Sequence, residues 1–191
     1  MLTALFAIAV SALLAPALSA RMDDRAGWFL ALAPLGAFAW FVSCIPIVAV
    51  GGVVTESIAW VPALGIDVAM RLDGLSLLFA LLITGIGTLI VLYAGAYLSD
   101  HHHLGRFYAY LLVFMMAMLG LVLADDLIAM FVFWELTSVA SFLLIAFQHE
   151  KSVSRRAALQ ALLITGGGGL ALLAGLVLLG IAGEAWRFSE L

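Results

Sequence analysis

A carboxylate, Glu135, lies inside a long apolar stretch that covers residues 127–147. An ionisable side chain in the hydrocarbon of a membrane costs about 2.5–3.5 kcal/mol on insertion scales, so a functional role is the first hypothesis for such a residue. Glu135 follows the start of the stretch by eight residues, which is ~12 Å at ~1.5 Å per residue. A carboxylate locked in structural hydrogen bonds is the alternative interpretation.

Polar residues accompany Glu135 on its predicted helix. At about 100° per residue, Ser138 and Ser141 fall on one flank of Glu135, and Thr137 lies further round. His149 projects within about 40° of the Glu135 face. Burial favours the neutral form of a carboxyl group and a nearby cation favours the charged form, so Glu135 is suited to taking up and releasing a proton. Ser138, Ser141 and His149 are candidates for its proton path, and His149 also fits an ordinary boundary residue.

Three further patterns could bind ligands but are better explained by structure. His101, His102 and His103 are consecutive and cannot all face one metal ion from a helix, so we interpret them as interfacial residues. The glycines at 166–169 lack the flanking Lys and Ser or Thr of a phosphate-binding loop, and we expect them to allow close helix packing. Cys44 is the only cysteine and is expected to be a small buried hydrophobe. The sequence predicts no metal site and no cofactor.

The elements that position these residues are predicted to be membrane helices. Hydrophobic residues make up 66% of the 191-residue chain and charged residues 10%, whereas a soluble domain has about 25% charged residues. Stretches of ~20 apolar residues, enough to cross ~30 Å of hydrocarbon, cover residues 1–20, 28–50, 75–98, 107–124, 127–147 and 157–182. We therefore predict an all-α polytopic membrane bundle of about six spans in one domain. The eight Lys and Arg residues are scattered and the net charge is −4, so nucleic acid is not expected as a partner.

The first predicted span and the connection before the third one carry further sequence signals. The first stretch has small residues at 15–20, as a signal-peptide cleavage site does, but no Lys or Arg at 1–10, so we expect it to stay as a helix. The connection 51–74 contains Trp60 and is predicted to be an irregular segment on the membrane surface, with Trp60 as a headgroup anchor. Asp73, beside Arg71, is expected to be the N-cap of the third helix.

Positive residues predict the orientation of the chain. Six of them lie in the first, third and fifth connections: Arg21, Arg25, Arg106, Lys151, Arg155 and Arg156. Only Arg71 and Arg187 lie in the second connection and the tail. Loops rich in Lys and Arg stay in the cytoplasm, so we expect both termini outside, together with the acidic residues Asp125 and Asp126.

Several segments carry a family resemblance. The sequence Phe-Trp-Glu-Leu-Thr-Ser at 133–138 continues through Ser-Phe-Leu-Leu-Ile at 141–145 to His-Glu-Lys at 149–151. This resembles the fifth helix of the A subunit of multisubunit Mrp-type sodium/proton antiporters. Residues 71–79, Arg-Leu-Asp-Gly-Leu-Ser-Leu-Leu-Phe, resemble the entry to that family's third helix, and the segments 105–108 and 119–123 resemble its fourth. The resemblance covers nearly the whole chain.

The resemblance implies a role for Glu135. In this family, which is related to the antiporter-like membrane-arm subunits of respiratory complex I, the fifth-helix glutamate is the acidic half of a buried pair with a lysine of a later helix. Glu135 would be the protonatable coupling group of a hetero-oligomeric complex in the bacterial cell membrane, which exchanges cytoplasmic sodium for external protons. Asp126 stands where family members carry Asn, a departure that leaves its role in doubt.

The family's antiporter core has more helices than the six predicted here. The only lysine, Lys151, lies in a predicted connection, so the partner lysine is expected elsewhere. A fragment, a truncated reading frame and a split subunit each explain the difference. Two other functions stay open: a proton-translocating subunit of a complex I-like or membrane-bound hydrogenase complex, and an assembly subunit that transports nothing.

Overall fold

The structure, a computed structural model of the chain, describes residues 1–22, 25–61, 66–98 and 103–191. It is built of long helices, two strands and two short 3-10 turns. In chain order these are α1 (Leu2–Met22), α2 (Ala26–Leu30), α3 (Leu32–Ala49), β1 (Val54–Val61), β2 (Ile66–Leu72), α4 (Gly74–Tyr97), α5 (Leu104–Leu123), α6 (Leu127–Ile145), η3 (Ala146–Gln148), α7 (Ser152–Gly183) and η4 (Phe188–Glu190). Six helical segments among the described residues are long and apolar enough to cross a membrane, with α2 and α3 counted as one. The predicted helical membrane bundle is confirmed.

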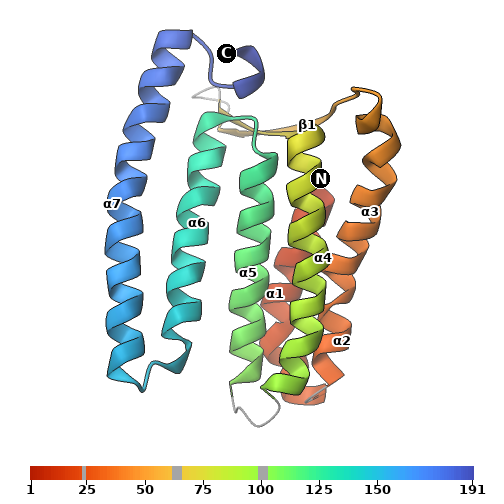
Figure 1. Cartoon of the computed structure of the whole chain (residues 1–191), viewed down its shortest axis with the longest axis vertical. Helices are drawn as coiled ribbons and strands as arrows, with labels where there is room; N and C mark the ends of the chain where they lie inside the picture. Colours follow the sequence, from red (N-terminus) through yellow and green to blue (C-terminus); the bar gives the residue numbers. More distant parts are fainter. Residues whose placement is uncertain (23–24, 62–65, 99–102) are drawn as a thin grey trace.

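The helices stand side by side, with α7, α6, α5, α4 and α3 in sequence across the molecule and α1 behind α5 (Figure 1). The main core lies where α1, α3, α4 and α5 meet, and its fully buried side chains include Ile8, Phe41, Val91 and Tyr108. Towards the other edge, α7 packs chiefly on α6 and is the least buried of the spans. Large apolar side chains are exposed along α1, α3, α4, α6 and α7, as expected where the surrounding solvent is lipid, whereas α5 has none and lies between its neighbours.

The second predicted span, 28–50, is interrupted. Helix α2 ends at Leu30 and α3 begins at Leu32, with Ala31 between them. Pro34 has no N–H to donate to the carbonyl of Leu30 four residues earlier, which accounts for a break at this point. The two helices still form a continuous apolar segment over Ala26–Ala49.

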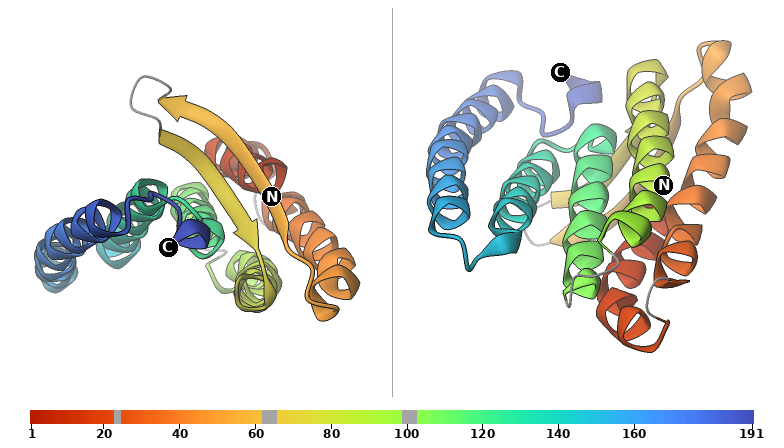
Figure 2. Two further views of the ribbon diagram at one scale, coloured as in Figure 1. Left: turned by 90° about the horizontal axis from the view of Figure 1, so that it is seen from above. Right: turned by 60° about the horizontal axis from the view of Figure 1, so that its bottom comes forward.

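The connection 51–74 was predicted to be irregular, and this prediction is wrong. Strands β1 and β2 pair there as an antiparallel hairpin, with Val54 opposite Leu72 and Ala59 opposite Asp67. Met70 and Leu72 of β2 are buried against the bundle with Arg71 between them, which is the pattern of a half-buried strand, while Ala69 is buried on the opposite face. The hairpin lies across one end of the helices (Figure 2). Pro62 and Gly65 fall outside the described residues, as does the side chain of Trp60.

Both chain ends lie at the hairpin end of the bundle. The Met1 ammonium pairs with Glu56 Oε1 of β1 at 2.9 Å, and the Leu2 N–H donates to Glu56 Oε2 at 2.9 Å. Partial burial of Glu56 opposes its ionisation, but these hydrogen bonds and the adjacent ammonium outweigh it and lower the pKa. Arg187, which follows α7, pairs with Asp67 of β2 at 2.8 Å. The hairpin is thus held to the start of α1 and to the segment after α7 by ion pairs.

The start of α4 is fixed by a capping box at the same end. The Leu75 and Ser76 N–H groups donate to Asp73 Oδ1 at 3.1 and 3.0 Å, and the Asp73 N–H donates to Ser76 Oγ at 2.7 Å. The predicted N-cap role of Asp73 is confirmed. The Ser76 N–H bond is the main reason that the pKa of Asp73 is lowered, with Arg71 adding to the effect.

Replacing Asp73 should destabilise the protein in a pH-dependent way. Loss of an N-cap costs about 0.5–2 kcal/mol, so Asp73→Ala should lower the thermal unfolding temperature in detergent at neutral pH. Because the folded-state pKa is lowered, the stabilisation by the carboxylate is present above its ordinary pKa and disappears as the pH falls through the folded value. Asp73→Ser keeps a capping oxygen that does not titrate, and should retain most of the stability. Equal stability of Asp73→Ala and wild type at neutral pH would contradict the role.

Candidate functional site

Glu135 begins the third turn of α6 and faces α7. It is half-buried, and its Oε1 atom is buried with no hydrogen-bond partner in the described part of the chain. An unsatisfied polar atom in such a place costs about 1–3 kcal/mol, and more if it is charged. The arrangement therefore leaves Oε1 open to a partner supplied from outside these residues.

Gly169 of α7 makes room for this carboxylate. A side chain at position 169 would place its Cβ in overlap with Glu135 Oε1, so only glycine leaves the space free. The rest of the run, Gly166, Gly167 and Gly168, has no neighbour within 4 Å among the described residues. The expected close packing of the glycine run is therefore found at Gly169 alone. No sequence pattern predicts this contact, because it depends on the rotation and height of α7 against α6.

The hydroxyl groups near Glu135 have other partners. Thr137 Oγ1 donates to the Trp134 carbonyl at 2.7 Å, and Ser138 Oγ donates to the same carbonyl at 3.3 Å. Such bonds to a preceding turn are usual for Ser and Thr inside helices. Ser138 is buried and Ser141 is half-buried. The structure thus places Ser138 and Ser141 on the helix that carries Glu135, and Ser138 is bonded to the backbone.

His149 does not share the helical face of Glu135. Helix α6 ends at Ile145 and the chain continues as the 3-10 turn η3, so a projection at 100° per residue fails before position 149. His149 is exposed beside Glu150 and Lys151 in the turn to α7, where its carbonyl accepts a bond from Arg155 Nη1 at 2.6 Å. The geometry does not bring His149 to Glu135. A path between them would need groups other than these side chains.

Of the three consecutive histidines, only His103 is among the described residues. It is exposed, precedes α5, and lines a shallow cavity with His149 and Lys151 at the end of the bundle opposite the hairpin. No group of three or more His, Cys, Asp or Glu side chains that could hold a metal ion is found within the described ranges. Cys44 is buried and carries no disulfide.

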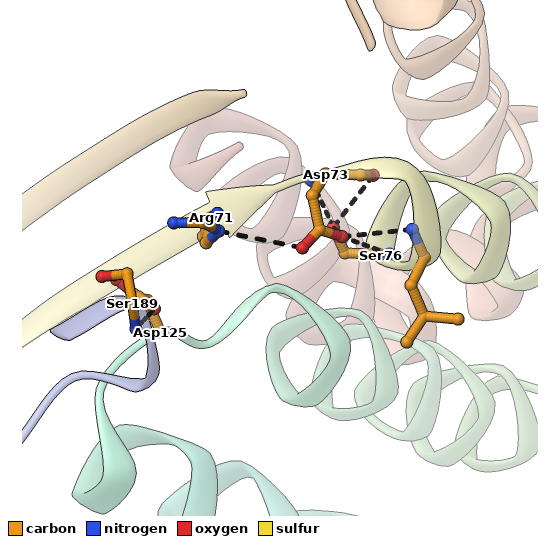
Figure 3. A network of polar contacts seen from close by, with 6 residues as sticks. Arg71, Asp73, Ser76, Asp125 and Ser189 are labelled. Atoms are coloured by element: carbon orange, nitrogen blue, oxygen red, sulfur yellow. Dashed lines mark hydrogen bonds and ion pairs between the residues drawn. The ribbon is translucent and has the colours of Figure 1, made fainter. Parts of the chain in front are cut away.

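The acidic residues of the α5–α6 turn have structural partners. Asp126 is the N-cap of α6 and accepts bonds from the Ile128 and Ala129 N–H groups at 2.9 and 2.8 Å. Burial raises the pKa of Asp126, and these bonds oppose the rise. Asp125 accepts bonds from Ser189 N and Ser189 Oγ at 3.0 and 2.6 Å (Figure 3). This contact with the tail was not predicted from the sequence, because it joins residues 64 positions apart.

Comparisons with known proteins agree with this arrangement. Residues 60–108 match the family model described as NADH-ubiquinone oxidoreductase (complex I), chain 5 N-terminus. Residues 124–191 match the model described as NADH:quinone oxidoreductase/Mrp antiporter, TM. The second match contains Glu135, Gly169 and the segment that binds Asp125.

Individual proteins with similar sequences include subunits of Na(+)/H(+) antiporters. The A subunit of the Na(+)/H(+) antiporter of Alkalihalophilus pseudofirmus is 53% identical over 154 residues, which cover 80% of this chain and 19% of that protein. The A1 subunit of the Na(+)/H(+) antiporter of Staphylococcus haemolyticus is 50% identical over 165 residues, 86% of this chain and 20% of that protein. A chain of the Mrp complex from Dietzia sp. DQ12-45-1b superposes with a TM-score of 0.87 at 34% identity, over 98% of this chain and 20% of that one. The chain thus spans about a fifth of the length of the relatives it matches.

Replacing Gly169 should displace the carboxylate of Glu135. A methyl group at position 169 overlaps Oε1, which is the mobile end of its side chain, so in Gly169→Ala the carboxylate should turn away from α7 while stability changes by less than about 1 kcal/mol. Reaction of Glu135 with a membrane-soluble carbodiimide, followed by mass spectrometry of the labelled peptide, should then become faster. Gly167→Ala adds the same methyl group where nothing lies within 4 Å and should leave the rate unchanged. Equal rates in the two variants would show that Gly169 does not confine the carboxylate.

Proposed function

Since the chain belongs to the family of membrane subunits shared by Mrp antiporters and NADH:quinone oxidoreductases, we propose that it forms the N-terminal part of an antiporter A subunit. In the complete complex this subunit couples proton influx to sodium efflux across the bacterial cell membrane. The proposal is supported by identities of 53% and 50% to Na(+)/H(+) antiporter subunits. The chain is then a transporter part rather than an enzyme, and its partners are the other antiporter subunits, lipid, protons and sodium ions.

The observation that carries the mechanism is the buried Oε1 atom of Glu135. It has no partner in the described ranges and lies against a glycine that no larger residue could replace without moving it. Burial without a partner favours the neutral form of a carboxyl group in general, and a nearby cation favours the charged form. In the proposed mechanism, Glu135 releases its proton as a cationic partner arrives and takes up a proton as that partner departs. Ser138, Ser141 and His149 stay candidates for the proton path, and each would need water or a further group to reach the carboxylate.

Replacing the titratable group should stop transport. Glu135→Gln in the complete complex should abolish the sodium-dependent dequenching of a pH-sensitive dye in everted membrane vesicles, because the amide fills the same space but cannot exchange a proton. Glu150→Gln makes the same chemical change at an exposed residue after η3 and should transport normally. Copurification of the subunits shows whether both complexes assemble. Antiport near the wild-type level in an assembled Glu135→Gln complex would overturn the proposed role.

The two alternative functions predict different outcomes in the same vesicle assay. A proton-translocating subunit of a redox complex, which the first family description favours, should support proton movement that depends on a quinone or another electron acceptor and is indifferent to sodium. An assembly subunit should allow full transport with Glu135→Ala, provided that the complex forms. Sodium dependence together with sensitivity to Glu135 separates the antiporter from both.

The hairpin end of the bundle is proposed to face outward. Arg21, Arg25 and Arg106 lie at the opposite end, as do the three positive residues at the start of α7, and such residues favour the cytoplasm. Both termini would then be external.

Thiol labelling in intact cells tests this orientation. In a Cys44→Ala background, Ser57→Cys in β1 should react with a membrane-impermeant maleimide added to whole cells. Ser152→Cys at the start of α7 should react only after the membrane is opened. Both native serines are exposed, so the pair is matched, and the reverse labelling pattern would invert the topology.

A further inference from the structure

A cavity of about 580 Å³ opens at the hairpin end, between the start of α4 and the end of α5. Its polar wall is formed by Arg71, Asp73, Ser76, Asp125 and Ser189, which Figure 3 shows from close by. Its other wall is apolar and comes from Leu75 and Phe79 of α4, Val122 of α5 and Phe188 of the tail. The antiporter role proposed above makes no use of this cavity.

The charged side chains that line the cavity have hydrogen-bond donors and acceptors available for a ligand. Arg71 meets one carboxylate oxygen, Asp73 Oδ2, at 3.7 Å, which is a loose ion pair. The guanidinium carries five N–H donors. Asp125 is only 6% exposed, and each of its two oxygens accepts one bond from Ser189. A carboxylate offers about four acceptor positions, so Asp125 can accept further donors.

A second, apolar groove lies further along the α4–α5 seam, the line where these two helices meet. It has a volume of about 280 Å³ and is lined by side chains that include Leu82, Ile86 and Ile90 of α4 and Leu111, Met115 and Met118 of α5. Leu75, Phe79, Leu82, Ile86 and Ile90 recur every three or four residues, and Val122, Met118, Met115 and Leu111 do the same, so both cavities lie on one face of each helix. The groove begins about 10 Å below Leu75 at ~1.5 Å per residue, within the ~15 Å of one hydrocarbon leaflet.

We propose that the α4–α5 seam binds a zwitterionic phospholipid with a primary ammonium headgroup, of the phosphatidylethanolamine class. Arg71 binds its phosphate, Asp73 and Asp125 bind its ammonium, and one acyl chain lies in the groove between Leu82 and Ile90. Two carboxylates and one guanidinium disfavour a lipid that carries only negative charge. Carboxylate and hydroxyl acceptors favour an ammonium with N–H donors over a choline, which has none.

The exposed apolar side chains along the α4–α5 seam fit a bound phospholipid. Leu75 is 67% exposed and Phe79 is 44% exposed at the level where a headgroup joins its acyl chains. Ile86 is 52% exposed in the groove below. An acyl chain covers such side chains without leaving polar groups unsatisfied, and the polar cavity above supplies the charged contacts that the headgroup needs.

Native mass spectrometry of the purified complete complex tests the proposal. The complex is exchanged into detergent with equal amounts of phosphatidylethanolamine, phosphatidylcholine and phosphatidylglycerol that carry identical acyl chains. Exposed ion pairs contribute up to about 1 kcal/mol, so the wild type should retain phosphatidylethanolamine about three- to fivefold over phosphatidylcholine. Asp125→Asn weakens the ammonium contact and should bring this ratio close to one, whereas Arg71→Gln removes the phosphate contact that both lipids share and should lower the retention of both. Arg106→Gln, the same change at the opposite end of the bundle, should preserve both the ratio and the retention.

Other results would overturn the proposal. A preference for phosphatidylglycerol would identify an anionic-lipid site. Failure of the complex to retain any of the three lipids would mean that protein covers the seam. Equal total lipid retention in Arg71→Gln and Arg106→Gln would exclude the cavity as the headgroup site. Because Asp125 also holds the tail, Asp73→Ser, which removes the other carboxylate of the cavity, is the deciding variant if Asp125→Asn does not assemble, and it should also lower the ratio.

Discussion

Hydrocarbon supplies no hydrogen bonds, and this constraint governs where polar groups lie in the protein. The backbone satisfies itself in long helices, and the hydroxyl groups of Thr84, Thr88, Thr137 and Ser138 bond to carbonyls of the preceding turn. Ion pairs and capping bonds gather at the hairpin end, beyond the apolar segments. Glu135 departs from this pattern, because its Oε1 is buried within a span without a partner in the described ranges. That departure is the observation behind the proposal that Glu135 exchanges a proton.

The features that follow from local chemistry could be read from the sequence. Six apolar segments and the N-cap at Asp73 require only the residues of one element, and both are found. Glu135 could be singled out because its cost in lipid does not depend on its neighbours. The stretch 66–72, in which Asp67 and Arg71 stand between apolar residues, also indicates a strand, but the nearby Trp60, Pro62 and Gly65 favour irregular structure.

Features that depend on two elements could not be read in this way. The contact of Glu135 with Gly169 needs the relative rotation and height of α6 and α7, which a single sequence does not fix. The projection from Glu135 to His149 failed because it assumed one helical period across the end of α6. The pairing of Arg187 with Asp67 joins residues 120 positions apart.

The small hairpin has a mechanical consequence for the bundle. It is bonded to the start of α1 through Glu56, to the α5–α6 turn through the Ala69 carbonyl and the Asp125 N–H, and to the segment after α7 through Asp67. At the opposite end, the contacts between α5 and the α6–α7 turn include an edge-to-face pair of Phe107 and Phe147. A helix that is held at one end moves most at its other end. A tilt of about 5° over a length of ~30 Å displaces that end by roughly 2.6 Å. Motions that open this protein should therefore be smallest beneath the sheet and largest at the far ends of α6 and α7.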